Sequence, residues 1–402
     1  MKRVLVSAFS CDPTRGSEAT TGWNWAVGLA EKGFEVHCIT RATSKTGIAT
    51  RTIPRNLTFH YLSLPLRMEK LYSASQPAMY LYYILWQWRA YKLAASLHLL
   101  RDFDMVHHVS WGSLQLGSFM YKLDVPFIFG PAGGGQTAPA AFKDYFGSAW
   151  STEEARSRVS RVLLRFNPAC KLMLKKAFVV LVSNADTLLM AESNGARNTR
   201  LMVDGGLPDW FFPDENIIKS PRKDELKLLW VGRFMPRKGT MLLLDLMKEL
   251  KDYPGITLTA VGDGVTREVF LETANKYGLD KTVHSSGAVP FEEVRGYYAN
   301  HDVFLFTSLR DSCPMQLVEA MAFGMPIVTL DLHGQGFIVD ADRGFKCACS
   351  TPDIAIGNLK VAILELYNNP TLVEQLSAGA FRFAANQAWR KKVDSVVDQF
   401  YR

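Results

Sequence analysis

Residues 308–329 read SLRDSCPMQLVEAMAFGMPIVT, and this segment decides the predicted fold of the second half of the chain. The preceding residues 303–306 form an apolar run that is typical of a buried parallel strand. Pro314 suits the first turn of a helix, and Gly324 followed by Pro326 is a signal for the end of a helix. We therefore expect a strand, a polar turn, a helix and a second strand.

The start of that helix offers a site for a phosphate group. The first backbone N–H groups of a helix, here near Met315, Gln316 and Leu317, have no partner within the helix, and the helix dipole favours an anion there. Two carboxylates flank this position, because Asp311 lies in the turn and Glu319 lies two helical turns further on. Carboxylates accept hydrogen bonds from the vicinal hydroxyls of a ribose or hexose. The segment predicts a nucleotide-sugar site; an ordinary surface aspartate and helix glutamate are the alternative.

A second group of polar residues follows the predicted strand 226–231. Gly232, Arg233 and Lys238 stand where this strand ends and the next helix begins. Cations beside unpaired helix N–H groups can neutralise a diphosphate. Solvated loop cations are the alternative, but the carboxylates downstream favour the functional interpretation.

These motifs resemble those of the retaining glycosyltransferases of family 4, among the group 1 glycosyltransferases. The resemblance rests on the acidic-x7-Glu motif from Asp311 to Glu319 and on the Gly-Arg…Lys-Gly motif within residues 232–239. It spans nearly the whole chain and is more specific in the second half. It implies the GT-B fold, an α/β architecture with two Rossmann-like, doubly wound parallel-sheet domains that face each other across a cleft. The family usually has Glu where this chain has the shorter Asp311.

The resemblance also implies roles for individual residues. Arg233, Lys238 and the helix amides would neutralise the leaving diphosphate, and Glu319 would hold the ribose. Gly264 would lie near the phosphates and Val289 near the nucleotide base. No protein nucleophile is implied, because in this family the leaving phosphate is thought to help deprotonate the acceptor. No metal and no cofactor are expected besides the nucleotide-sugar co-substrate.

The first strand–helix unit of the chain contains a loop that would face the donor phosphates. Residues 4–7 predict a strand, residues 20–32 a helix and residues 34–40 a second strand, which is a βαβ unit of Rossmann type. Gly16 and Ser17 lie in the connecting loop, where a glycine allows close approach of a ligand. A plain strand–helix turn is the alternative.

Two adjacent histidines end the predicted strand 103–108, which resembles the Asp-x-Val-His strand end of the family. Rossmann folds place ligands at such carboxyl ends. His107 or His108 would orient the donor sugar together with Asp311, or position the acceptor, and His108 is the preferred candidate. Trp111 would line the sugar site. Structural histidines at the strand end are the alternative.

A run of three glycines, Gly133, Gly134 and Gly135, follows the predicted strand 126–129. Consecutive glycines are costly in conformational entropy. They are explained if the backbone lies against a ligand, so we expect this loop on the acceptor side of the site.

Residues 155–176 form a basic segment without acidic residues. Its apolar stripe and its arginines fall on different helix faces, which suits contact with an anionic membrane or a lipid-diphosphate acceptor. A solvated helix face is the alternative.

The chain length and the amino-acid composition are consistent with a globular two-domain protein. The chain has 402 residues, of which 48% are hydrophobic and 21% charged, enough for two cores. The net charge of +7 favours anionic partners. The six cysteines are scattered, so we expect reduced thiols and no zinc site. No nucleic-acid motif is present, and nothing at the start reads as a signal peptide.

We therefore expect an N-terminal acceptor-side domain over residues 1–206, against which residues 386–402 pack, and a nucleotide-sugar domain over residues 207–385. The expected function is retaining, metal-independent transfer of a hexose-type sugar from a UDP-sugar, or secondly a GDP-sugar, to a glycan or lipid-linked acceptor in cell-surface glycan synthesis. The alternatives are a small soluble acceptor, a GT-B epimerase or hydrolase, and a non-catalytic nucleotide-binding protein. We expect a cytoplasmic location, with peripheral contact to the inner face of the plasma membrane.

Overall fold

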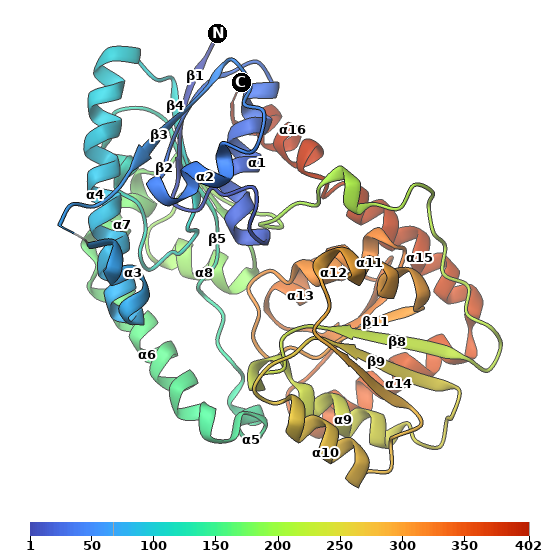
Figure 1. Cartoon of the computed structure of the whole chain (residues 1–402). Coiled ribbons are helices and arrows are strands. Elements are labelled where there is room, and N and C mark those ends of the chain that lie inside the picture. Colours follow the sequence, from blue (N-terminus) through green and yellow to red (C-terminus); the bar gives the residue numbers. More distant parts are fainter. Residues whose placement is uncertain (67, 402) are drawn as a thin grey trace. The chain divides into compact units, whose positions relative to one another are not determined.

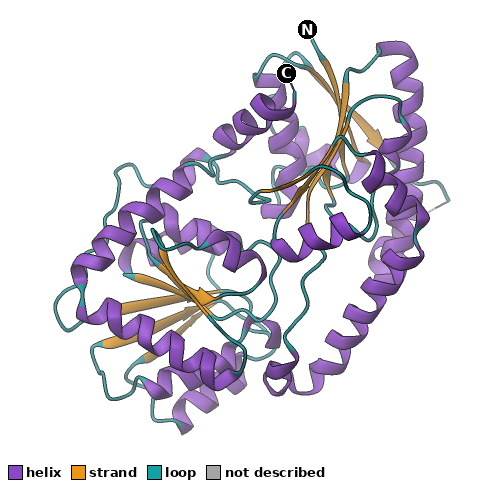
Figure 2. Cartoon of the chain, turned by 180° about the vertical axis from the view of Figure 1, so that it is seen from behind, coloured by secondary structure: helices purple, strands orange, loops and turns teal. Residues whose placement is uncertain are grey.

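The computed structural model of the chain describes residues 1–66 and 68–401, and it does not place the side chains of Ser17 and Glu18. The described chain forms two compact units. Unit 1 comprises residues 1–135, 159–205 and 389–402, and unit 2 comprises residues 136–158 and 206–388. Each unit is a parallel sheet flanked by helices (Figures 1 and 2), which confirms the predicted α/β class.

Unit 1 contains a seven-stranded sheet with the order β3-β2-β1-β4-β5-β6-β7. Its strands are β1 (Arg3–Ala8), β2 (Glu35–Arg41), β3 (Leu57–Leu62), β4 (Met105–Ser110), β5 (Phe127–Ala132), β6 (Val179–Val182) and β7 (Thr199–Leu201). Its helices are α1 (Ser17–Glu31), α2 (Lys45–Ile48), α3 (Leu71–Ala74), α4 (Gln76–Arg101), α7 (Pro168–Lys176), α8 (Ala185–Ser193) and α16 (Trp389–Phe400), and the second half of α6 (Trp150–Phe166) belongs to it. The strand order reverses between β1 and β4, so their carboxyl ends form the switch point where such sheets bind ligands.

Unit 2 contains a six-stranded sheet with the order β10-β9-β8-β11-β12-β13. Its strands are β8 (Leu226–Val231), β9 (Ile256–Val261), β10 (Val283–Gly287), β11 (Val303–Phe306), β12 (Ile327–Leu330) and β13 (Gly344–Cys347). Its helices are α5 (Lys143–Phe146), α9 (Thr240–Glu249), α10 (Arg267–Lys276), α11 (Phe291–Asn300), α12 (Met315–Ala322), α13 (His333–Ile338), α14 (Pro352–Asn368) and α15 (Pro370–Ala385). The predicted order of strand, turn, helix and strand is thus present as β11, α12 and β12. The switch point of this sheet lies between β8 and β11.

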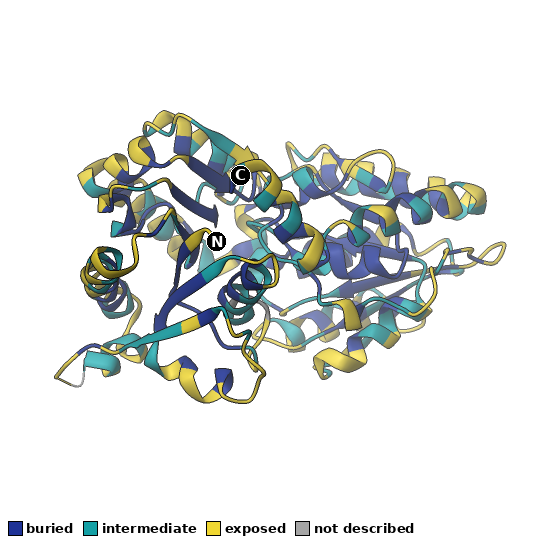
Figure 3. Ribbon diagram, turned by 90° about the horizontal axis from the view of Figure 1, so that it is seen from above, coloured by how far each residue is buried: buried dark blue, intermediate teal, exposed yellow. Residues whose placement is uncertain are grey.

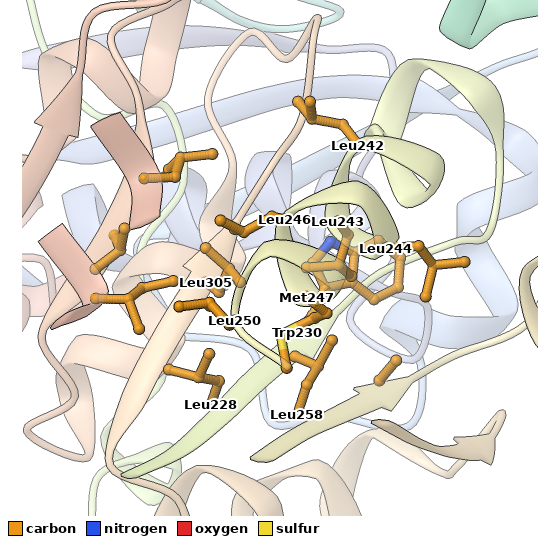
Figure 4. Packing of buried hydrophobic residues seen from close by; sticks show 14 of the residues in the cluster. Leu228, Trp230, Leu242, Leu243, Leu244, Leu246, Met247, Leu250, Leu258 and Leu305 are labelled. Carbon is orange, nitrogen blue, oxygen red and sulfur yellow. The ribbon is translucent and has the colours of Figure 1, made fainter. Parts of the chain in front are cut away.

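The buried strands have apolar side chains on both faces, as parallel sheets between helix layers require. In unit 2, Leu228 and Trp230 of β8 and Leu258 of β9 pack with the leucines of α9 (Figure 4). Figure 3 shows the same arrangement by burial, with buried strands and helices that expose their outer faces. These cores hold the carboxyl ends of the strands in place.

The structure differs from the predicted domain boundaries at residues 136–158, which belong to unit 2 and not to the N-terminal unit. Phe142 and Phe146 of this segment lie in the hydrophobic core of unit 2. The hydroxyl of Tyr145 donates a hydrogen bond of 2.8 Å to Asp245 of α9. Packing therefore assigns the segment to a unit that is remote from it in sequence.

Helix α16 closes the chain as part of unit 1. Val393 lies against Gly28 of α1, where a Cβ atom would come within 2.7 Å of the valine side chain. The Lys392 amine donates a hydrogen bond to the carbonyl of Val203. The last helix is thus bound to the first one although almost the whole chain separates them.

Candidate functional site

The two loops that carry the predicted diphosphate-binding residues meet at the switch point of unit 2. Strands β8 and β11 are neighbours in the sheet, so the loops that follow them lie side by side. The Ser308 hydroxyl donates to the carbonyl of Arg237 over 3.1 Å, and the Thr307 hydroxyl donates to that of Lys238 over 3.2 Å. At Gly239, φ is +66° and a Cβ atom would lie 2.1 Å from the Thr307 carbonyl oxygen, which explains the glycine.

A buried ion pair joins these loops. Lys238 Nζ lies 2.6 Å from Asp311 Oδ2, and Arg237 Nη1 lies 3.4 Å from the same oxygen. The Ser308 hydroxyl also lies 2.9 Å from Asp311 Oδ2, so its single proton is shared between this carboxylate and the Arg237 carbonyl. The carboxylate that the sequence assigned to the donor sugar is therefore the counter-ion of the predicted diphosphate-binding lysine.

The pKa values of the pair follow from burial and mutual attraction. Burial opposes the ionised form of Asp311, but the charges of Lys238 and Arg237 and the hydrogen bonds outweigh it, so the pKa of Asp311 is lowered. For Lys238, burial is the larger effect, and the pKa is lowered despite the attraction of Asp311. Arg233, which is exposed, adds a repulsion that lowers the pKa of Lys238 further. The site thus concentrates positive charge where little water screens it.

Glu319 is buried on α12 and is held by a residue of the preceding helix. The Tyr298 hydroxyl, on α11, donates a hydrogen bond of 2.9 Å to Glu319 Oε2. Burial raises the pKa of Glu319 to about 7, against the opposing effects of this hydrogen bond and of the Lys238 charge. The carboxyl group therefore holds its proton more tightly than an ordinary glutamate, and it lies within the electrostatic reach of Lys238.

Helix α12 begins at Met315 after Pro314, and no side-chain cap bonds to its first turn. The Leu317 N–H donates to the Pro314 carbonyl over 3.1 Å. Of the three predicted amides, Leu317 therefore has a partner in the chain, and Met315 and Gln316 are the better candidates for an anion. A helix start beside the Lys238 cation is suited to a phosphate.

The remaining predicted donor residues of unit 2 lie in the loops after β8, β9 and β10. Gly264 has φ of +151°, and a Cβ atom there would lie 2.3 Å from the Phe234 carbonyl oxygen, so the backbone itself requires glycine. At Gly232 a Cβ atom would contact the Trp230 ring at 3.2 Å. Val289 is half-buried after β10. Their contacts with a donor stay predictions.

Both predicted histidines lie inside unit 1 and are fully buried. His107 Nδ1 lies 2.6 Å from the Tyr401 hydroxyl and its Nε2 2.8 Å from the Gly130 carbonyl oxygen. Burial lowers the pKa of His107 to about 3. These partners are those of a structural histidine, which is the alternative that the sequence left open.

His108 has an equally complete set of partners. Its Nδ1 lies 3.0 Å from the Ser7 hydroxyl, and its Nε2 lies 3.1 Å from the Trp111 carbonyl oxygen and 3.2 Å from the Tyr83 hydroxyl. Burial lowers its pKa to about 4. Direct contact between this ring and a sugar would require these partners to separate, so the donor-sugar role of either histidine stays a prediction.

Trp111 is half-buried and lies in an aromatic cluster at the switch point of unit 1. Its ring is stacked on Tyr83 at 5.4 Å and lies 4.8 Å from Phe9. The Arg41 guanidinium lies over the rings of Phe9 and Tyr72. Sequence reasoning identified only Trp111, because the other members come from separate segments that only the fold brings together.

The predicted glycines of unit 1 differ in whether the surrounding protein leaves room for a side chain. A Cβ atom at Gly16 would meet nothing within 4 Å, so packing does not explain this glycine. At Gly134 it would lie 2.4 Å from the Gln115 amide, and at Gly135 it would lie 2.5 Å from the backbone of Asp186. Packing within the protein therefore explains Gly134 and Gly135 without a ligand, and their acceptor-side role stays a prediction.

Gly133 is bridged to Ser113, and its N–H donates to the Gly112 carbonyl over 2.8 Å. The side chain of Ser17 lies outside the described part of the structure. The acceptor-side and donor roles of these two residues stay predictions.

Sequence reasoning missed residues that hold the site together. Tyr298 is one, and Glu153 is another, with Oε1 2.7 Å from Arg310 Nε and 2.8 Å from Arg156 Nη2. Glu153 thereby ties the segment 136–158 to the turn that contains Asp311. No local sequence pattern predicts either role, because Tyr298 bonds to Glu319 and Glu153 pairs with Arg310, which are distant in sequence.

No metal ligand set was found in the described part of the chain. Within residues 1–66 and 68–401, His, Cys, Asp and Glu side chains form no group of three or more that could hold a metal ion. The cysteines of this part are free thiols.

Comparisons with known proteins match the part of the chain that contains Lys238, Asp311 and Glu319 to a glycosyl transferase family model. Residues 213–382 match the family model described as glycosyl transferases group 1. One relative is a subunit of human phosphatidylinositol N-acetylglucosaminyltransferase, which is 29% identical over 155 residues that cover 37% of this chain and 32% of that protein. The matches cover only 27% to 54% of the length of the first four curated relatives.

Solved structures extend the similarity to the whole chain. Sucrose-phosphate synthase from Thermosynechococcus elongatus has a TM-score of 0.67 at 20% identity, covering 100% of this chain and 98% of that one. HepE from Anabaena in complex with UDP has a TM-score of 0.63 at 15% identity, covering 100% of both chains. The chain has the GT-B fold, and the family model for group 1 glycosyl transferases matches its second half.

Proposed function

We propose that the protein is a glycosyltransferase that moves a hexose-type sugar from a nucleoside diphosphate sugar to a glycan or lipid-linked acceptor, with retention at the anomeric carbon. The observation that carries the proposal is the buried Lys238 amine, which lies beside Asp311 at the switch point of unit 2 and within electrostatic reach of Glu319. In this arrangement Lys238 and the helix start match the diphosphate of such a donor, Asp311 its glycosyl bond and Glu319 its ribose.

In this proposal Lys238 and Arg233 stabilise the negative charge that develops on the leaving diphosphate. Preorganised charges in a site that excludes water are the largest contribution in many enzymes. The N–H groups at the start of α12 add to it, and Glu319 accepts hydrogen bonds from the ribose hydroxyls. The leaving phosphate takes the proton of the acceptor hydroxyl, so no protein nucleophile and no metal ion take part.

Donor binding changes the partners of Lys238. Its amine contacts Asp311 in the structure, and a phosphate oxygen would become a second or replacing partner. Asp311 is then positioned next to the glycosyl bond, where it can orient the donor sugar. UDP is the first nucleotide to test, because the similar HepE structure contains UDP; GDP is the second.

The acceptor is proposed to be a lipid-linked or surface glycan. The name of the human relative includes phosphatidylinositol, which supports a lipid acceptor. None of the described helices combines the length and apolar character that crossing a bilayer requires. Residues 155–176 are proposed to contact an anionic membrane at its cytoplasmic face through their arginines and lysines.

The test is a thermal-shift panel of UDP, GDP, ADP and dTDP, with and without magnesium, followed by transfer assays with the donor that binds. We expect one diphosphate to raise the melting temperature independently of magnesium. No shift with any of them would refute the donor site. Donor hydrolysis or epimerisation that needs no acceptor would point to a related enzyme, and binding without turnover would point to a non-catalytic protein.

A further inference from the structure

An apolar cavity of about 320 Å³ opens on unit 1, and none of the residues assigned to the donor site lines it. It lies among α4, α6, α7 and the short helix η3 (Phe119–Lys122), and Figure 1 labels the first three of these helices. Its walls include Ile84, Leu116, Phe119, Val162, Leu163 and Phe166.

The polar groups of the wall are already satisfied by the protein. The Ser118 hydroxyl donates to Gln87 Oε1 over 3.1 Å. The Asn167 amide donates to the Gln115 carbonyl, and its oxygen caps α7 by accepting from the Cys170 N–H. Burial raises the pKa of the Cys170 thiol to about 12, so it is neutral. The cavity therefore presents hydrocarbon surface and no charge to an occupant.

The rim of the cavity is unusually apolar for a surface. Phe166 is 73% exposed, Val162 49% and Ile84 40%. Leu81 of α4 and Leu172 of α7 are exposed on the same helices. Contiguous exposed apolar side chains of this kind mark an interaction site.

Exposed cations lie on two of the helices that carry this apolar surface, and three of these elements contain no acidic residue. Arg158, Arg161 and Arg165 follow one another at i, i+3 and i+7 and share a face of α6 next to the stripe of Val162 and Phe166. Lys171 and Lys175 are exposed on α7. The sequences of α4, α7 and η3 contain no Asp or Glu. This charge is complementary to an anionic head group next to an apolar chain.

We propose that this cavity takes up one hydrocarbon chain of an anionic membrane lipid, while the arginines and lysines at its rim bind the head group. A hydrophobic insertion combined with a basic patch gives the two contributions that stable membrane binding needs. The proposal goes beyond the surface contact described above and does not rest on sugar transfer, because the binding is measured without any donor.

The test separates chain insertion from charge attraction with two kinds of variant. Ala169→Phe fills the cavity from α7, and the double variant Arg161→Gln/Arg165→Gln removes rim charge and leaves the cavity open. Ala155→Phe is the matched control, because Ala155 is exposed on α6 and does not line the cavity. Thermal unfolding checks that each variant is folded, and Val162→Ser replaces Ala169→Phe if the latter unfolds.

Co-sedimentation with phosphatidylglycerol–phosphatidylcholine vesicles and fluorescence of the fatty acid cis-parinaric acid are measured for each protein. We expect Ala169→Phe to lose the cis-parinaric acid signal and to bind vesicles at least about tenfold more weakly, and Ala155→Phe to behave as wild type. The arginine variant should keep the fatty-acid signal and lose the salt-sensitive part of vesicle binding.

Three results would overturn the proposal. They are equal vesicle binding by Ala169→Phe and wild type, equal binding to pure phosphatidylcholine vesicles, and a concentration-dependent dimer that Ala169→Phe dissociates. The last would show that a second copy of the chain covers the cavity.

Discussion

The Tyr298 hydroxyl donates a hydrogen bond of 2.9 Å to Glu319 Oε2, and both side chains are buried in unit 2. This contact favours the carboxylate form of a group whose burial favours the neutral form. The ionised carboxylate offers the most acceptor sites to the two ribose hydroxyls. We therefore expect Tyr298 to be a positioning residue for donor binding.

Tyr298→Phe is therefore expected to raise the pKa of Glu319 further and to weaken donor binding at neutral pH. We expect KM for the donor to rise by about tenfold with a small change in kcat, because a hydrogen bond to a charged group contributes about 1.5 kcal/mol or more. Raising the pH should recover much of the affinity. A variant whose KM is raised equally at every pH would show that Tyr298 acts through packing alone.

Glu319→Gln tests the raised pKa of Glu319 through the pH dependence of the free energy of unfolding. The folded-state pKa of Glu319 is about 7, against an ordinary value of 4.5. The folded protein therefore holds this proton more tightly than the unfolded chain, and the resulting stability is present below about pH 4.5 and is lost as the pH rises to about 7.

Wild type should thus be about 3 kcal/mol less stable than Glu319→Gln at pH 8 and nearly equal to it at low pH. Urea denaturation of both proteins over this pH range measures the difference, in which the other titrating groups cancel. A constant difference would mean that the carboxyl group has an ordinary pKa.

Asp311→Asn leaves the Lys238 amine buried without its closest counter-charge. Removal of one partner of a buried ion pair costs about 3 kcal/mol or more. The control is Asp340→Asn, since Asp340 is exposed and 3.9 Å from Lys346, and such pairs contribute less than about 1 kcal/mol. Chemical denaturation compares the two, and similar losses would show that Asp311 is not the counter-ion.

Lys238→Ala should abolish most transfer per folded molecule, and it should also lower stability because Asp311 loses its closest partner. Loss of one group that stabilises transition-state charge costs roughly 100-fold to 1000-fold in kcat. Turnover with the selected donor and the UDP thermal shift are measured together. Full turnover in this variant would remove Lys238 from the proposed site.

Gly16→Ala and Gly135→Ala separate a ligand-facing glycine from a packing glycine. At Gly16, φ is −56° and a Cβ atom would have open space, so the alanine variant should be as stable as wild type but bind the donor more weakly. Gly135→Ala should lose about 1 kcal/mol or more, because its Cβ atom would overlap the backbone of Asp186. Unchanged donor affinity in Gly16→Ala would show that this loop does not approach the phosphates.

His107→Phe should be destabilised by about 2 kcal/mol or more, because Tyr401 and the Gly130 carbonyl lose their partner. Activity per folded molecule should change little, and it should not follow a group with a pKa near 6.5, because the pKa of His107 is about 3. His284→Phe is the exposed control. A stable variant with a large loss of kcat would restore the catalytic role.

Local sequence signals were sufficient to predict the strands and the helix that carry the candidate site. The apolar run at residues 303–306, Pro314 and the Gly324 stop predicted β11, the start of α12 and its end, because each signal acts on its own neighbours in the chain. The same is true of β8 and the Arg233–Lys238 loop. The resemblance of these motifs to those of family 4 glycosyltransferases indicated the GT-B fold.

Contacts between distant residues could not be predicted in this way. The pairing of Lys238 with Asp311, the burial of His107 against Tyr401 and the transfer of residues 136–158 to unit 2 each join segments far apart in sequence. They depend on which strands lie side by side and on which side chains fill the space between helices and sheet.

The sequence by itself thus determined the parallel α/β architecture and the positions of the loops after β8 and β11, where we propose that a donor diphosphate binds. These predictions rest on hydrophobic periodicity, on the placement of glycine and proline and on charge. All of these are properties of the sequence that do not depend on the tertiary structure. Only the tertiary structure decided the state of the groups in those loops: that Asp311 neutralises Lys238, that Tyr298 holds Glu319, and that burial brings the pKa of Glu319 to about 7. Desolvation and hydrogen-bond geometry exist only once the chain has packed.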